Sequence, residues 1–207
     1  MVIKSLIVIC SLFVGELAFA ETIFYLHGRI IEVEGVQPVH RRFGLYDYHG
    51  IVDALQANGA TVISEVRPAD TKPVEFARKV VDQIEELIKS GEPASDITIV
   101  GFSKGGGIAI YASSLLNNSE VNFVFLAACG SWVSSNPELT VNGNILSIYE
   151  ESDTMGRSCE NFVRRNDEIS SFQEIELSTG KGHGAFYLPR DVWTNPLLAW
   201  IADIAKP

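Results

Sequence analysis

DITIVGFSKGGGIAIYASSLL, residues 96–116, is the stretch that decides the fold. Residues 96–100 form a short β-branched run that predicts a buried strand, and the small and apolar residues 104–116 predict a helix. Between them, residues 101–105 have the pattern Gly-x-Ser-x-Gly. A serine in this context occupies a sharp turn from strand to helix, and the two glycines keep the turn free of side chains. Ser103 is therefore expected to expose its hydroxyl at the edge of a sheet.

Similar apolar runs occur on both sides of this stretch, alternating with helical patterns. The other predicted strands are residues 22–26, 60–66, 121–127, 144–149 and 172–177, and the other predicted helices are residues 48–58, 73–90, 158–169 and 197–205. Near-continuous apolar strands are typical of parallel sheets covered on both faces. Six strands alternating with five helices predict an α/β fold, a three-layer sandwich with a doubly wound, mostly parallel six-stranded sheet. Residues 28–47 and 128–143 remain as long connections at the carboxyl edge, where such sheets bind ligands.

The serine needs a base, because a hydroxyl is a poor nucleophile until its proton is accepted, and histidine suits neutral pH. His183 lies in the glycine-flanked stretch 180–184 after the last predicted strand, so it is the expected base. The other histidines, expected to act through their backbone or as packing and surface residues, are His27, His40 and His49.

The histidine needs a carboxylate that holds its tautomer and stabilises the imidazolium. Asp153, just beyond the fifth predicted strand, is the expected partner. The alternatives are Glu150, Glu151 and Asp70. The chain order Ser103, Asp153, His183 is the order of a nucleophile elbow and its partners.

Two backbone N–H groups are needed to bind the oxyanion that forms during acyl transfer. One is expected from Lys104, directly after the serine. The other is expected from Arg29 in the segment after the first predicted strand, with Ile30 as the neighbouring alternative. The side chain of Lys104 is expected to be an exposed residue at the start of a helix, without a chemical role.

Together these residues resemble the α/β-hydrolase superfamily over nearly all of residues 22–206. The matching features are His27-Gly28 after the first strand, the elbow at residues 101–105, Asp153 after a late strand and His183 after the last. The strings LHGRIIE at residues 26–32 and ISEVRPAD at residues 63–70 are similar to a small, poorly characterised bacterial branch. The resemblance implies a doubly wound sheet and serine acyl-transfer chemistry, usually hydrolysis of an ester, thioester or amide.

The chain departs from the larger members of that superfamily, because it leaves room for neither an amino-terminal hairpin nor a cap domain. An open site without a lid is therefore expected. Its walls are expected to be residues 28–47, Trp132 and the pair Phe186-Tyr187, with ordinary packing as the alternative role of these aromatics. Arg67 is a candidate contact for an anionic substrate, together with Arg41 and Arg42.

The first 20 residues predict export. Residues 1–4 carry one positive charge, residues 5–17 are largely apolar, and residues 18–20 form an Ala-x-Ala cleavage site. We expect residues 1–20 to be a signal peptide that is removed, which leaves residues 21–207 as a single domain without a membrane span. The expected location is the periplasm or the exterior of the cell.

Composition excludes several classes of protein. A hydrophobic fraction of 46% with 20% charged residues is that of a folded domain. The net charge of −10 argues against a nucleic-acid partner, because phosphates attract clustered Lys and Arg. Cys129 and Cys159 either form a disulfide or stay as two thiols. No spacing of cysteines or histidines suggests a metal, and no cofactor is expected.

The sequence thus predicts a serine hydrolase, esterase-like, that acts on a small-molecule acyl substrate through an acyl-enzyme. The alternatives are an acyltransferase or peptidase that uses the same three residues, and a noncatalytic binding protein that retains the fold.

Overall fold

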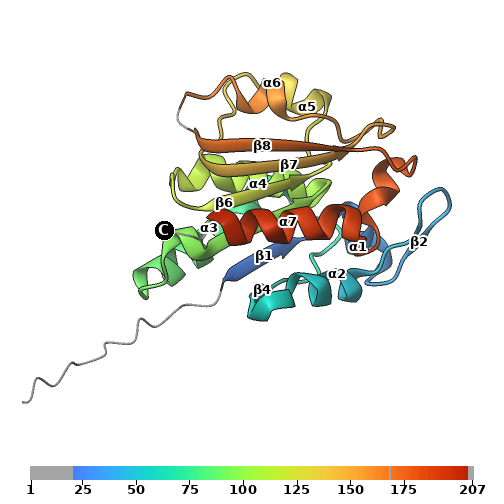
Figure 1. Cartoon of the computed structure of the whole chain (residues 1–207), viewed down its shortest axis with the longest axis horizontal. Helices are drawn as coiled ribbons and strands as arrows, with labels where there is room; N and C mark the ends of the chain where they lie inside the picture. The colour runs from blue at the N-terminus through green and yellow to red at the C-terminus, as the bar shows by residue number, and fades with distance from the viewer. Residues whose placement is uncertain (1–20, 168, 205–207) are drawn as a thin grey trace, which may run out of the picture.

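The computed structural model describes residues 21–167 and 169–204, so the predicted signal peptide lies outside the described residues. The predicted parallel sheet is confirmed: six strands lie in the order β4-β1-β5-β6-β7-β8 and each neighbouring pair is parallel (Figure 1). The strands are β1 (Thr22–Leu26), β4 (Thr61–Ile63), β5 (Ile97–Phe102), β6 (Asn122–Leu126), β7 (Gly143–Glu150) and β8 (Ile169–Leu177).

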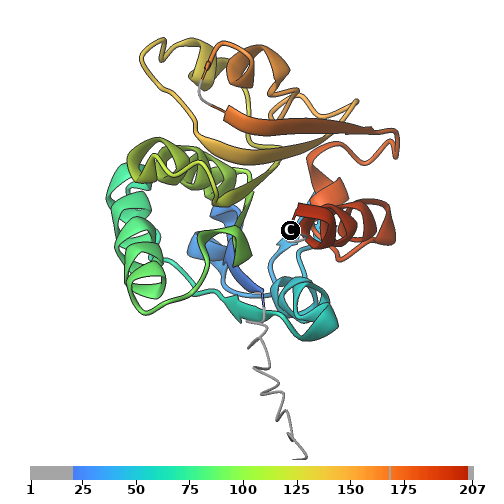
Figure 2. The same cartoon turned by 60° about the vertical axis from the view of Figure 1, so that its left-hand side comes forward.

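Helices cover both faces of the sheet. Figure 2 shows α3 (Pro73–Lys89) and α4 (Lys104–Leu116) on one side, and α2 (Tyr48–Leu55) and α7 (Asp191–Ile204) on the other. The alternation of side chains along a strand supplies both interfaces. Ile97 and Ile99 of β5 pack in the core that contains α3 and α4, whereas Val100 and Phe102 pack in the core that contains α2 and α7. The predicted three-layer sandwich is therefore confirmed.

The two long connections predicted as loops contain short elements. The first holds α1 (Arg29–Glu34) and a small antiparallel hairpin of β2 (Val39–His40) and β3 (Gly44–Leu45). The second holds α5 (Ser131–Ser134). Cys129, just before α5, forms a disulfide with Cys159, just before α6 (Glu160–Val163). Within the described ranges, no helix combines the length and the hydrophobicity needed to span a bilayer.

Two helices differ from the predictions by more than one turn. The helix predicted over residues 158–169 is reduced to α6, since β8 already begins at Ile169. α7 begins at Asp191 instead of residue 197, and Pro196 lies inside it. The extra turn buries Trp193 and Thr194 under the sheet, which favours the helix despite the proline.

Candidate active site

Ser103 lies at the turn between β5 and α4, in a backbone conformation that is rare for a residue with a side chain. Its φ of 55° and ψ of −116° are unfavourable by about 1–3 kcal/mol and need support from the surrounding structure. The support comes from hydrogen bonds on both sides of the turn. The N–H of Ser103 donates to Leu126 O at 3.0 Å, and the N–H of Gly107 donates to Ser103 O at 2.9 Å.

Neither glycine of the Gly-x-Ser-x-Gly pattern could carry a side chain. A Cβ on Gly105 would lie 1.8 Å from Leu26 O, and a Cβ on Gly101 would lie 2.4 Å from Gly105 O. These distances are far below van der Waals contact, so the backbone of the turn would have to move. The packing of α4 against β1 and β5 thus explains the glycine spacing around Ser103.

His183 contacts both Ser103 and Asp153. Its Nε2 lies 2.8 Å from Ser103 Oγ, and its Nδ1 lies 2.6 Å from Asp153 Oδ2. An ionised Asp153 can only accept, so Nδ1–H donates to it and Nε2 is free to accept the serine proton. His183 and Asp153 are 5% and 6% exposed, so their hydrogen bond is shielded from bulk water, whereas Ser103 is partly exposed. The structure therefore brings together the three residues that the sequence singled out.

Glu150, the alternative carboxylate at the end of β7, anchors the segment that carries His183. Its two oxygens accept from the backbone N–H groups and hydroxyls of the following residues: Ser152 N and Oγ, Thr179 N and Oγ1, Gly180 N and Gly182 N. Burial raises the pKa of Glu150, but the hydrogen bonds from Ser152 and Thr179 outweigh it and lower the pKa to about 2. The carboxylate of Glu150 therefore stays ionised. Its hydrogen bonds go to Ser152 and to residues just before His183, and none of those described goes to His183 itself.

The expected oxyanion donors lie at the amino ends of two helices on adjacent strands. Arg29 is the first residue of α1 and Lys104 the first residue of α4. Leu26 of β1 is in register with Gly101 of β5, so the two helices begin at the same edge of the sheet. The first N–H groups of a helix have no intrahelical acceptor. In the described part of the chain, neither of these two N–H groups donates to a protein acceptor.

A buried charge cluster, which no sequence pattern predicted, connects the starts of these two helices. Glu32 of α1 accepts from Arg67 Nε at 2.9 Å through Oε1 and from Lys104 Nζ at 2.5 Å through Oε2. Lys104 Nζ also donates to Thr71 O at 2.7 Å. The Lys104 side chain, expected to be exposed, is only 18% exposed. No local pattern pairs these residues, because 35 positions separate Glu32 from Arg67.

Arg67 is not the substrate contact that the sequence suggested. Its side chain is fully buried, is held by Glu32, stacks over the ring of Phe76 and does not line the cavity beside Ser103. The backbone N–H of Arg67 donates to Nε2 of His27 at 3.1 Å, and Nδ1–H of His27 donates to Gly28 O at 2.9 Å. Burial and the charge of Arg67 lower the pKa of His27 to about 4, which keeps its ring neutral.

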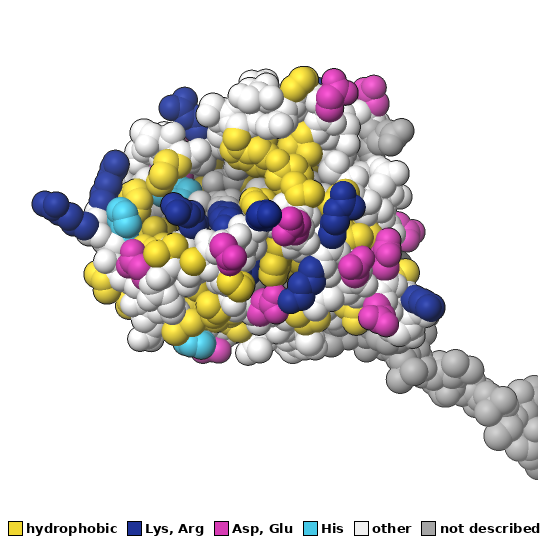
Figure 3. Space-filling model, turned by 180° about the vertical axis from the view of Figure 1, so that it is seen from behind, with side chains coloured by type: hydrophobic (Ala, Val, Ile, Leu, Met, Phe, Trp, Pro, Cys, Tyr) yellow, Lys and Arg dark blue, Asp and Glu magenta, His cyan; other side chains and the backbone are white. Residues whose placement is uncertain are grey.

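A cavity of about 310 Å³ opens beside Ser103 and His183. Its remaining wall is mostly apolar and consists of Pro73, Lys104, Gly107, Tyr111, Ala127, Ala128, Trp132 and Met155. Trp132 thus lies where the sequence expected a substrate contact. Phe186 does not: it is 1% exposed and packs against Phe102 and Trp193 in the core. On the face in Figure 3, hydrophobic side chains gather in a hollow bordered by acidic and basic ones.

The described residues hold no group of three or more His, Cys, Asp or Glu side chains that could bind a metal ion. The site as described therefore consists of a serine, a histidine and a carboxylate in hydrogen-bonded contact, with free N–H groups and an apolar cavity beside them.

Comparisons with known proteins find one family model and several solved structures that are similar to this chain. A model of the phospholipase/carboxylesterase family matches residues 65–157, a range that includes Ser103 and Asp153 and ends before His183. No curated protein sequence matches the chain. Among solved structures, Arabidopsis thaliana SOBER1 is similar over 91% of this chain and 100% of its own, with 15% identity and a TM-score of 0.58.

Two other solved structures are similar over a comparable share of this chain. An arylesterase covers 90% of this chain and is itself covered over 77%, with 14% identity and a TM-score of 0.62. Est1E from Butyrivibrio proteoclasticus covers 89% of this chain and is covered over 88%, with 11% identity and a TM-score of 0.59. At such identities the likeness establishes a shared fold.

Proposed function

Starting from the α/β-hydrolase fold of this chain, we propose that it is a serine hydrolase that cleaves a carboxylic ester or a related acyl substrate. The observation that supports this most strongly is the pair of hydrogen bonds made by His183, to Ser103 on one side and to Asp153 on the other. These three side chains come from positions 80 and 30 residues apart, so their contact does not arise from local sequence.

In the proposed reaction, Ser103 Oγ attacks the acyl carbonyl carbon while His183 Nε2 takes the serine proton. Asp153 stabilises the imidazolium, and the N–H groups of Lys104 and Arg29 donate to the oxyanion. The tetrahedral intermediate collapses, the alcohol leaves with the proton from Nε2, and the acyl group stays on Ser103. Water, deprotonated by the same nitrogen, then releases the acid and restores the serine.

The cavity beside Ser103 supports an apolar acyl group of modest size. Its volume of about 310 Å³ is at the small end of ligand pockets, and its wall is formed largely by Tyr111, Trp132 and Met155 together with alanine and proline. The family match and the esterase names of similar structures favour an ester over an amide. We further propose export to the periplasm or beyond, since the Cys129–Cys159 disulfide suits an oxidising compartment.

A fluorophosphonate probe and a series of 4-nitrophenyl esters of increasing acyl length test the proposal. We expect labelling and hydrolysis in the wild type and the loss of both in Ser103→Ala. The matched control is Ser90→Ala at the exposed end of α3, which should retain both.

The other outcomes identify the alternatives. A folded wild type that neither reacts with the probe nor turns over any ester is a noncatalytic binding protein. Labelling with acyl transfer to an added alcohol in place of hydrolysis identifies an acyltransferase, and turnover of anilides but not esters identifies a peptidase.

A further inference from the structure

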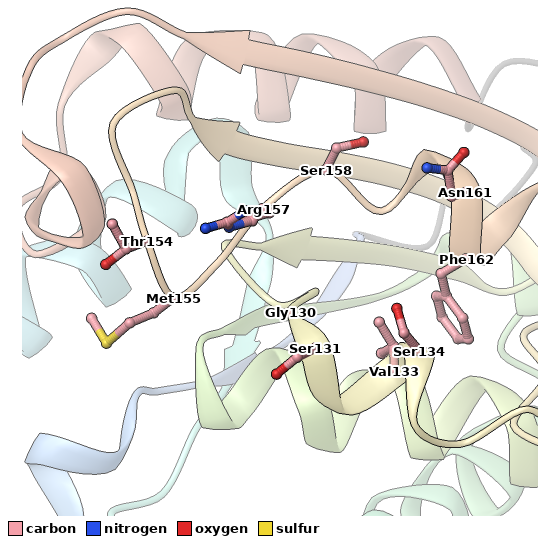
Figure 4. Close-up of a pocket in the computed structure, with 10 residues that line it drawn as sticks. All are labelled: Gly130, Ser131, Val133, Ser134, Thr154, Met155, Arg157, Ser158, Asn161 and Phe162. Carbon is pink, nitrogen blue, oxygen red and sulfur yellow. The ribbon is translucent and has the colours of Figure 1, made fainter.

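A second cavity, of about 550 Å³, adjoins the cavity beside Ser103. It lies between residues 130–134, which include α5, and residues 154–162, which lead into α6 (Figure 4). Met155 lines both cavities. Met155 is therefore a shared wall, and a substrate bound at Ser103 would reach the second cavity if it were long enough to pass this side chain.

Two links hold the opposite walls of the second cavity together. The Cys129–Cys159 disulfide joins the residues that precede α5 and α6. The backbone N–H of Arg157 donates to Cys129 O at 2.6 Å. A main-chain hydrogen bond and a disulfide therefore hold the two walls in a fixed position relative to each other. A site that is ordered beforehand loses less free energy when it binds a ligand.

The lining of this cavity is rich in polar groups without protein partners. In the described part of the chain, no hydrogen bond is made by the side chains of Ser131, Ser134, Thr154 and Asn161, all of which line it. Val133 and Phe162 add an apolar patch beside them. The cavity therefore offers both hydrogen-bonding groups and contact area to a ligand.

Arg157 is the charged residue of this lining, and its guanidinium is unpaired among the described residues. Neighbouring charges are already engaged: Arg164 pairs with Glu160, and Asp153 pairs with His183. Glu174 accepts from the Ser158 hydroxyl and from Cys159 N–H. Among the described residues no carboxylate lines the cavity, although the chain has 26 acidic residues against 16 basic ones.

We propose that the second cavity binds a carboxylate at the far end of the substrate, with Arg157 as its partner; this proposal rests on the proposed hydrolase function. A guanidinium presents two parallel N–H donors that match the two oxygens of a carboxylate. The neighbouring hydroxyls and the Asn161 amide supply further donors, and Phe162 covers the carbon chain. The substrate class is then an ester that carries an acid group on either its acyl or its alcohol part.

Two matched pairs of esters test this. In 4-acetoxyphenylacetate and its amide the charge is on the alcohol part, and in 4-nitrophenyl hydrogen adipate and its terminal amide it is on the acyl part. We expect the acid to have a KM lower than its amide by about five- to tenfold in one pair, the range between an exposed ion pair and a hydrogen-bonded one. That pair identifies the part of the substrate that occupies the cavity.

Arg157→Gln should abolish the preference, because it raises the KM of the acid ester to that of its amide. Its backbone N–H, which holds the wall, is retained. Arg164→Gln is the matched control, because Arg164 is an exposed arginine of the same region that already has a carboxylate partner. Equal KM values within both wild-type pairs, or a preference that survives in Arg157→Gln, would overturn the proposal.

A binding measurement separates this proposal from the proposed function. Isothermal titration calorimetry measures the affinity of the wild type for 4-hydroxyphenylacetate and for adipate, each compared with its amide. This measurement does not depend on turnover. If no ester is hydrolysed, binding of one acid that is lost in Arg157→Gln still supports the subsite. If neither acid binds better than its amide, the subsite is wrong whatever the activity.

Discussion

The Lys104 ammonium and the Glu32 carboxylate form an ion pair that joins the first residue of α4 to α1, with Nζ 2.5 Å from Oε2. The second oxygen of Glu32 accepts from Arg67 Nε. α1 begins at Arg29 and α4 at Lys104, the residues whose N–H groups we propose as oxyanion donors. Glu32 therefore has a bracing role: its ion pair with Lys104 holds the first turns of α1 and α4 in a fixed position relative to each other.

Glu32→Gln should destabilise the protein and impair catalysis. The substitution leaves the buried guanidinium of Arg67 without a counter-charge, so we expect the free energy of unfolding to fall by about 3–5 kcal/mol. The helix starts lose their shared partner, so kcat should fall more than KM rises. Urea unfolding and ester hydrolysis measure the two effects.

The control for Glu32→Gln is Glu65→Gln, which breaks the half-exposed ion pair with Lys79. Exposed pairs of this kind contribute at most about 1 kcal/mol. If both variants unfold at the same urea concentration and hydrolyse esters at the wild-type rate, Glu32 has no bracing role.

Glu150→Gln should loosen the segment that carries His183. An amide replaces one of two oxygens that accept from the residues around Ser152 and Gly182, so we expect a loss of about 2–3 kcal/mol at pH 7. The pKa of Glu150 is lowered from 4.5 to about 2, so its stabilisation is complete above pH 4.5 and is lost as the pH falls toward 2.

Chemical unfolding of the wild type and of Glu150→Gln from pH 7 to pH 2 checks this. The stability difference between the two proteins should shrink below pH 4.5, because the unfolded chain takes up the proton first. A difference that stays constant over this range would show that the charge of Glu150 contributes nothing. Glu151→Gln, which removes an exposed carboxylate next to it, is the control.

Much of this arrangement could be predicted because parallel strands bring their carboxyl ends to one edge. Ser103, Asp153 and His183 each follow a strand, so a correct strand assignment was enough to place them near one another. The partners of Arg67 could not be predicted, because burial of a charge depends on a tertiary contact with Glu32 that leaves no periodic pattern.

The start of α7 was predicted wrongly for a local reason. The prediction began the helix at residue 197, directly after Pro196, because a proline inside a helix removes a backbone hydrogen bond and is unfavourable. In the structure α7 begins at Asp191, and the burial of Trp193 against Phe186 outweighs the cost of the proline. Propensity alone carries no information about that packing.

Asp153→Asn should reduce kcat about 10³- to 10⁴-fold while the protein stays folded. The amide would donate a hydrogen bond to His183 Nδ1, so the imidazole proton would move to Nε2, which could then no longer accept the proton of Ser103. Steady-state hydrolysis measures the loss. Asp70→Asn, at an exposed position that was the alternative carboxylate, should leave kcat unchanged.

The Cys129–Cys159 disulfide should stabilise the protein by about 3–4 kcal/mol, as estimated from the loss of loop entropy in the unfolded chain. The two residues are 30 positions apart in the sequence, and both side chains are buried. Intact mass after alkylation, with and without prior reduction, counts the free thiols: none should react before reduction and two should react after it. Cys129→Ala/Cys159→Ala should unfold at a lower temperature than the oxidised wild type.

Because the bond joins the two walls of the second cavity, the double variant should also lose the preference for the acid ester while it retains hydrolysis of the amide ester. Two thiols that react without reduction would remove both the stabilisation and this link between the walls.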